Sequence, residues 1–164
     1  MAAITTATKT NYRVISNHGF AEILQNEING EKSLHSITSF NAGDIICNFS
    51  GEKILSQPTY LTVQIAETKH IILNPVFLQY INHSCTPNVF FDTHSFELIA
   101  LKTIQPGDEL TFFYPSTEWS MAQPFACTCG TANCLQTISG AAHINTEILV
   151  KYKLTHFIQR MLNQ

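Results

Sequence analysis

Three of the five cysteines of this chain fall within one short stretch, CTCGTANC, at positions Cys127, Cys129 and Cys134. The stretch is rich in Gly, Thr and Asn, so its three thiols cannot all be core residues. A C-x-C pair is also too tight for an unstrained disulfide. An odd number of cysteines fits a secreted disulfide framework poorly, whereas clustered cysteines in a reducing compartment more often bind metal. The spacing therefore predicts a structural zinc site, with redox-active or merely reduced thiols as the alternative.

A structural zinc site needs a fourth ligand, because zinc in such sites is tetrahedral. The candidates elsewhere in the chain are Cys47, Cys85, His83 and His143. Cys47 lies within the apolar alternation of DIICNF and is better explained as a buried free thiol. Cys85 lies in the polar, turn-like stretch YINHSCTPN, and we expect it to be the fourth ligand.

Most of the chain before residue 114 consists of short β-type runs separated by turn residues. Such regular short strands are typical of a mainly β domain built from small sheets. The segment 88–101 has the pattern of a hairpin, and NPVFLQYI that of a single helical turn. One longer helix is predicted at the C-terminus, from about residue 145 to residue 162, with Asn145 or Thr146 as its cap. Its apolar face could pack on the domain or serve a homodimer.

Composition narrows the classes of function. The net charge is −3 at pH 7, so the chain has no basic field for direct binding of nucleic acid. No apolar run approaches the roughly 18 residues of a membrane helix, and membrane association is not expected. The start of the chain lacks the apolar core of a signal peptide, so we expect an intracellular protein, cytoplasmic or nuclear.

Four motifs occur in a fixed order: FSGE (49–52), NHSCTPN (82–88), GDELTFFY (107–114) and CTCGTANC (127–134). Taken together, and over residues 33 to 138, they resemble the SET-domain protein lysine methyltransferases with a post-SET zinc motif. The resemblance implies a SET-domain fold of several small curved β-sheets with a knot-like C-terminal threading. It implies an N-terminal segment at 1–32, holding the first strands, and a SET domain at 33–117. A post-SET zinc loop would follow at 118–140, and a C-terminal helix at 141–164.

The resemblance also implies a function: transfer of a methyl group from S-adenosylmethionine to the lysine ε-amine of a protein, histone or not. Asn82 and His83 would contact this cofactor, and Tyr114 would be both the catalytic tyrosine and a cofactor contact. Lys32 and Ser33 occupy the cofactor loop, where the family carries glycines. The zinc ligands would be those expected above, with Cys85 completing the cluster.

The substrate channel would be lined by Phe112, Tyr114 and Trp119. The resemblance suggests that Phe112, which lacks a hydroxyl, leaves room for a second or third methyl group. Two other readings of the chain remain. The missing glycines are compatible with a degenerate SET domain that binds proteins without activity, and the cysteines with a structural or redox protein.

Overall fold

The computed structural model describes residues 11–164; the first ten residues of the predicted N-terminal segment lie outside this range. Thirteen strands, three 3₁₀ helices (η) and two α-helices follow one another in the described part. Their order is β1 (Tyr12–Asn17), β2 (Ala21–Asn26), β3 (Lys32–Ser36), β4 (Ile45–Asn48), β5 (Ser50–Leu55), β6 (Thr62–Ala66), β7 (Lys69–Asn74), η1 (Val76–Tyr80), β8 (Asn82–His83), β9 (Val89–Asp92), β10 (Glu97–Ala100), β11 (Thr111–Phe112), η2 (Tyr114–Ser116), β12 (Phe125–Ala126), β13 (Thr137–Ile138), η3 (Ala141–His143), α1 (Thr146–Leu149) and α2 (His156–Leu162).

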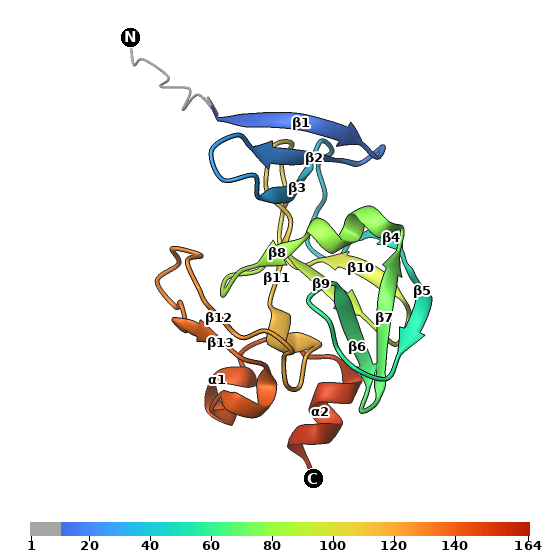
Figure 1. Cartoon of the computed structure of the whole chain (residues 1–164), viewed down its shortest axis with the longest axis vertical. Coiled ribbons are helices and arrows are strands. Elements are labelled where there is room, and N and C mark those ends of the chain that lie inside the picture. Colours follow the sequence, from blue (N-terminus) through green and yellow to red (C-terminus); the bar gives the residue numbers. More distant parts are fainter. Residues whose placement is uncertain (1–10) are drawn as a thin grey trace.

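The strands form five small sheets, which confirms the predicted mainly β fold. Three sheets have three strands each, in the orders β1-β2-β3, β4-β10-β9 and β5-β7-β6; β8 with β11 and β12 with β13 form the two others. Figure 1 shows the β1–β3 sheet at one end of the molecule and the two C-terminal helices at the other, with β8 and β11 between them. Strand β3 begins at Lys32, so β1 and β2, which precede that expected boundary, form one sheet with the strand that runs across it.

The predicted hairpin is present, because β9 and β10 pair antiparallel with Leu98 opposite Phe91. The predicted helical turn is also present, as η1. Along β9 and β10, Phe91 and Leu98 are fully buried and join the main core, which the first three sheets share. Burial of these alternating apolar side chains is the main stabilising term for such short strands.

Strands β8 and β11 pair parallel, with Thr111 opposite Asn82 and Phe112 opposite His83. The contact continues past the strands: the amide of Ser84 donates to the Phe112 carbonyl (3.0 Å), and that of Asn88 to the Thr111 carbonyl (3.1 Å). The NHSC segment and the segment that ends in Tyr114 thus lie side by side, although about thirty residues separate them in the chain.

The C-terminal helix is two helices rather than one. Asn145 caps α1 as predicted, its side chain accepting from the Glu147 amide, but α1 ends at Leu149. The Thr155 side chain, which accepts from the Ile158 amide, starts a second helix, α2. Competition of such side-chain caps with the helical backbone explains why a continuous apolar periodicity is interrupted here.

The two helices pack on the domain itself. Leu149, Leu154, Phe157 and Ile158 are buried in a second core around Phe113. The apolar face that could have served a homodimer is therefore largely used within the chain, and dimerisation stays a prediction without support.

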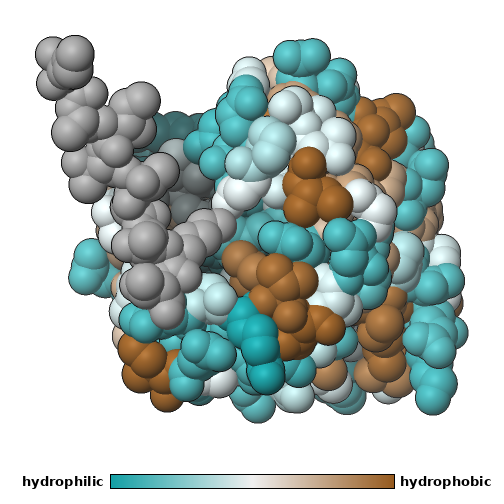
Figure 2. Space-filling view, turned by 90° about the horizontal axis from the view of Figure 1, so that it is seen from above, coloured by the Kyte–Doolittle hydropathy of each residue, from teal (hydrophilic) through white to brown (hydrophobic). Residues whose placement is uncertain are grey.

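Seen from above, the face of the molecule carries apolar side chains in separate patches among hydrophilic ones (Figure 2). Tyr12, Val14 and Ile15 of the edge strand β1 are among the exposed apolar residues. Within residues 11–164, no helix is long and apolar enough to cross a membrane.

Candidate functional site

A cavity of about 900 Å³ opens beside the β8–β11 pair. Its wall combines four parts of the chain that are distant in sequence: Tyr12 of β1, the stretch from Asn26 to Ser33, the region from residue 59 to residue 84, and the segment from Glu109 to Cys129. Most of the residues predicted for the cofactor and substrate sites line it; these are Lys32, Ser33, Asn82, His83, Phe112 and Tyr114.

Asn82 ties two walls of the cavity together. Its side-chain Nδ2 donates to the Lys32 carbonyl oxygen (3.0 Å) and to Glu109 Oε1 (3.1 Å). The contact to Lys32 uses the backbone, so it does not require glycine at that position. The Lys32 side chain lies over the ring of Tyr80, 5.4 Å from its centroid, and Ser33 Oγ is 2.9 Å from His35 Nε2.

His83 is enclosed by aromatic rings and presents a neutral imidazole. Burial lowers its pKa to about 4. Its ring lies within 6 Å of those of Phe113, Tyr114 and Phe125, at centroid distances of 5.7, 5.3 and 5.8 Å. Its Nδ1 accepts a hydrogen bond from the Tyr114 amide (3.2 Å), which fixes the start of η2 against β8.

Tyr114 is held by the same group of rings. Its hydroxyl donates to the Ile81 carbonyl at 3.4 Å, and its ring lies 4.7 Å from that of Phe112. Burial, with the nearby carboxylates Glu109 and Glu118, raises the pKa of Tyr114 to about 12. The phenol therefore stays protonated at neutral pH and can donate or orient, but it cannot act as a phenolate base.

Sequence reasoning missed Glu118, which lines the cavity four residues after Tyr114 and is only 7% exposed. Burial raises the pKa of its carboxyl to about 7. The only sequence signal was an acidic residue soon after the tyrosine, in a segment that reads as a loop. Trp119, by contrast, was predicted to line the substrate channel, but its side chain packs against the second core and it is not among the residues that line the cavity.

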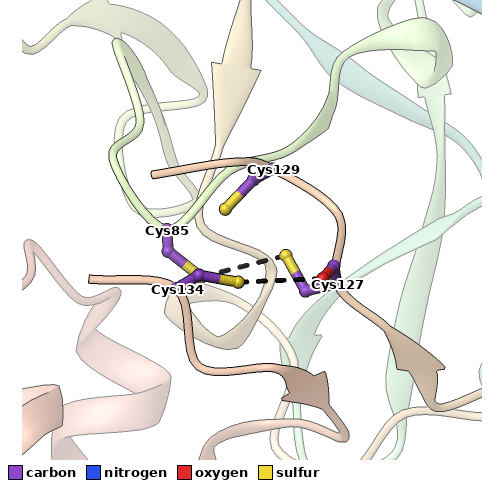
Figure 3. A group of neighbouring side chains, drawn as sticks. All are labelled: Cys85, Cys127, Cys129 and Cys134. Carbon is purple, nitrogen blue, oxygen red and sulfur yellow. Dashed lines mark hydrogen bonds between the residues drawn. The ribbon is translucent and has the colours of Figure 1, made fainter. Parts of the chain in front are cut away.

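The four predicted zinc ligands converge. The sulfur atoms of Cys85, Cys127, Cys129 and Cys134 all lie within 4.8 Å of one another, and Figure 3 shows their side chains pointing toward a common centre. Four sulfurs at 2.3 Å from a tetrahedral zinc would be about 3.8 Å apart, and the Cys85 and Cys127 sulfurs are 4.0 Å apart. The cluster thus fits a metal ion.

The other candidate ligands lie elsewhere. Cys47 is in β4, where burial raises the pKa of its thiol to about 11, as expected for a packed thiol. Nε2 of His143 lies 3.3 Å from Ser120 Oγ. Neither Cys47 nor His143 belongs to the cysteine cluster.

The cysteine cluster adjoins the cavity. Cys127 and Cys129 line both, and the Cys85 sulfur is 3.3 Å from His83 Nε2. On its other side, the Cys85 carbonyl accepts hydrogen bonds from the Tyr152 hydroxyl (2.8 Å) and from Asn133 Nδ2 (2.6 Å). These contacts join the turn after β8, the cysteine loop and the C-terminal helices into one unit.

A similar overall arrangement occurs in a solved structure, that of the methyltransferase domain of human histone-lysine N-methyltransferase SETMAR. The TM-score is 0.50 at 17% identity, over 79% of this chain and 58% of that one. This likeness concerns the fold.

Two relatives extend the comparison to sequence. Methyltransferase flvH of Aspergillus flavus is 38% identical over 132 residues, which are 79% of this chain and 74% of the relative. A histone-lysine N-methyltransferase of Candida albicans, H3 lysine-36 specific, is 32% identical over 78 residues, 44% of this chain but only 9% of the relative. Residues 31–115 match the SET domain family. With these motifs, this cavity and this fold, the chain belongs to the SET domain family of methyltransferases.

Proposed function

We propose that the chain is an S-adenosylmethionine-dependent protein-lysine N-methyltransferase, with Tyr114 as its catalytic residue. The observation that carries the proposal is that Asn82, His83 and Tyr114 line one cavity, although about thirty residues separate β8 from Tyr114 at the start of η2. Methyl transfer to an amine mainly requires that two reactants are aligned, and a cavity of about 900 Å³ shared by these side chains suits that task.

One part of the cavity would hold the cofactor, which would contact Asn82, His83, Lys32, Ser33 and Tyr114. The Asn82 amide already braces the Lys32 backbone, which would compensate for the missing glycines. When bound, S-adenosylmethionine supplies a methyl group on a positively charged sulfonium. The carboxylates Glu31 and Glu109 on the cavity wall would favour that charge.

The other part would receive the lysine side chain, along Phe112 and Tyr114. The Tyr114 hydroxyl and the Ile81 carbonyl, 3.4 Å apart, would orient the amine. The aromatic walls exclude water, which lowers the pKa of a lysine amine below its usual value of about 10.4. Phe112 brings no hydroxyl and would leave room for more than one methyl group. Trp119 has no support as a third wall of this channel.

The four cysteines would hold one zinc ion with a structural role. Cys127 and Cys129 belong to the cavity wall, so an ordered metal site would also order this wall. The substrate would be a protein lysine. Some relatives are named histone-lysine N-methyltransferases, so a histone is one candidate and a non-histone protein the other. Such an enzyme with reduced cysteines would be intracellular, cytoplasmic or nuclear.

Two measurements, made one after the other, test the proposal. Titration calorimetry should show that S-adenosylhomocysteine binds the chain, that Asn82→Ala weakens binding, and that Asn163→Ala, an exposed position, does not. Mass spectrometry after incubation with S-adenosylmethionine and either histones or lysate of the source cell should then reveal methyl-lysine. Absence of ligand binding at millimolar concentration would instead favour a SET domain that binds proteins without activity.

A further inference from the structure

Glu118 is a buried carboxylate placed directly beside the catalytic tyrosine. Its side chain is 7% exposed and lines the cavity. The Glu118 amide donates to the Tyr114 carbonyl (3.0 Å), so one tight turn carries both side chains. Ionised carboxylates are rarely this buried unless a cation pairs with them, yet no salt bridge of Glu118 occurs among the described residues.

The structure holds this carboxylate from one side only. Glu118 Oε1 accepts hydrogen bonds from the Gln64 amide (2.8 Å) and from Thr117 Oγ1 (3.1 Å). The other carboxylate oxygen has no hydrogen bond to any residue between 11 and 164. One oxygen is thus anchored to β6, and the second remains available to a ligand in the cavity.

The backbone around Glu118 is also fixed. The Trp119 amide donates to Gln64 Oε1 (2.9 Å), and the Glu118 carbonyl accepts from the Ala141 amide (2.8 Å). Gly140 permits this approach: its φ is +107°, and a Cβ there would lie 2.5 Å from the Trp119 carbonyl oxygen. A carboxylate with such support is positioned before any ligand arrives.

We propose that Glu118 binds the substrate amine and accepts a proton from it. The group that binds there would then be an alkylammonium ion, either a primary one or one that already carries a methyl group. This inference rests on the proposed function and adds the group that selects a charged amine. The free carboxylate oxygen accepts a hydrogen bond from the ammonium. One N–H bond then breaks as an O–H bond forms on Glu118, giving the neutral amine and a neutral carboxylic acid, and the amine keeps the electron pair needed for methyl transfer.

The electrostatics of the cavity agree with this role. Burial raises the pKa of Glu118 to about 7, so the carboxyl can both take up and release a proton near neutral pH. The charged or titratable side chains that share its cavity are Glu31, Glu109, Lys32, His83, Tyr12, Tyr60 and Tyr114, besides Cys127 and Cys129. Three carboxylates against one lysine favour a cationic ligand.

A purely structural role would also explain the anchored oxygen, and the experiment separates the two. The probe is n-butylammonium chloride, titrated into the full ¹⁵N-labelled chain saturated with S-adenosylhomocysteine and followed by amide chemical shifts. Glu118→Gln keeps the oxygen that accepts from Gln64 and Thr117 but removes the charge. We expect this variant to bind butylammonium tenfold to a hundredfold more weakly, on the order expected for a charged hydrogen bond. The exposed Glu147→Gln should bind it as wild type does.

Wild-type protein gives a second readout that does not depend on a variant folding. Since the carboxylate must be ionised, butylammonium binding should strengthen roughly tenfold from pH 6 to pH 8, whereas binding of the neutral 1-pentanol should not change. Equal binding by wild type and Glu118→Gln, or a flat pH profile, would overturn the inference.

Once a protein that this chain methylates has been identified, kcat/KM for that protein can be measured. Glu118→Gln should lower it tenfold to a hundredfold, as for butylammonium binding, and should leave the affinity for S-adenosylhomocysteine unchanged. A variant with wild-type kcat/KM contradicts the inference. Failure of wild type to methylate any lysine would contradict the proposed function alone, because the butylammonium titration still decides the role of Glu118.

Discussion

The imidazole Nδ1 of His83 accepts a hydrogen bond from the backbone amide of Tyr114, at 3.2 Å. The other nitrogen of the same ring, Nε2, lies 3.3 Å from the Cys85 sulfur. One half-buried ring thus links the residue proposed to catalyse methyl transfer with a residue of the cysteine cluster. Disturbance of the cysteine cluster is therefore expected to reach the cavity without a change in any reacting group.

Replacement of Cys85 tests this link. We expect Cys85→Ser to lose most of its zinc and to lower the free energy of unfolding by about 3 kcal/mol or more, since a structural metal contributes directly to folding. S-adenosylhomocysteine should bind more weakly as well. Elemental analysis, chemical denaturation and calorimetry measure the three quantities.

Cys47→Ser is the matched control for that variant, because Cys47 lies outside the cluster. It should retain one zinc per chain. A Cys85→Ser protein with a full zinc content would show that Cys85 is not a ligand.

Phe113 anchors the C-terminal helices. It is 2% exposed, and its ring stacks on that of Tyr152, with a centroid distance of 3.7 Å and an interplanar angle of 6°. Truncation to Ala leaves a cavity in the second core, so Phe113→Ala should cost about 3–5 kcal/mol of unfolding free energy. Val150→Ala, at an apolar position that is 66% exposed, should change it by less than about 0.5 kcal/mol in the same urea titration. Similar values for the two variants would contradict the proposed anchoring.

The four members of the cysteine cluster could be predicted from sequence, because ligand type and spacing restrict structural zinc sites strongly. Cys85 follows from this logic although it lies 42 residues before Cys127. The division of the C-terminal segment into two helices could not be predicted in the same way. Leu154, Phe157 and Ile158 keep a helical period, and only the tertiary contacts of Tyr152 and the cap at Thr155 decide where the helix breaks.

Glu118 and Trp119 show where prediction of the cavity residues from the sequence ends. They are neighbours in a loop without periodicity, so sequence alone cannot say which side chain enters the cavity. The decision is made by the side chain and amide of Gln64, on a strand more than fifty residues earlier, which hold this loop in register. Strands β2, β3 and β5 lack the regular alternation that predicts a strand. The two-residue strands β8, β12 and β13 lie in segments expected to be a turn or a loop, and they are too short to show any periodicity.

The buried carboxyl of Glu118 predicts a pH effect on stability. Its pKa is raised from 4.5 to about 7 in the folded chain, so between these values the folded state binds more protons than the unfolded state. The unfolding free energy must then fall as pH rises through this window, by on the order of 3 kcal/mol from this group.

Other groups titrate in the same range, so the comparison is between wild type and Glu118→Gln. Denaturation at several pH values should show that the stability of wild type relative to the variant declines from about pH 4.5 to pH 7 and is constant above about pH 8. A constant difference across the whole range would mean that Glu118 does not change protonation on folding.

The role of Tyr114 is tested most directly by transfer of a tritiated methyl group from S-adenosylmethionine to a protein substrate, measured for wild type and for Tyr114→Phe. The variant loses only the hydroxyl that lies 3.4 Å from the Ile81 carbonyl. We expect transfer by wild type and at least a hundredfold slower transfer by Tyr114→Phe, with zinc content, melting temperature and S-adenosylhomocysteine affinity close to wild type. Full activity in the variant would contradict the assignment of Tyr114 as the catalytic residue.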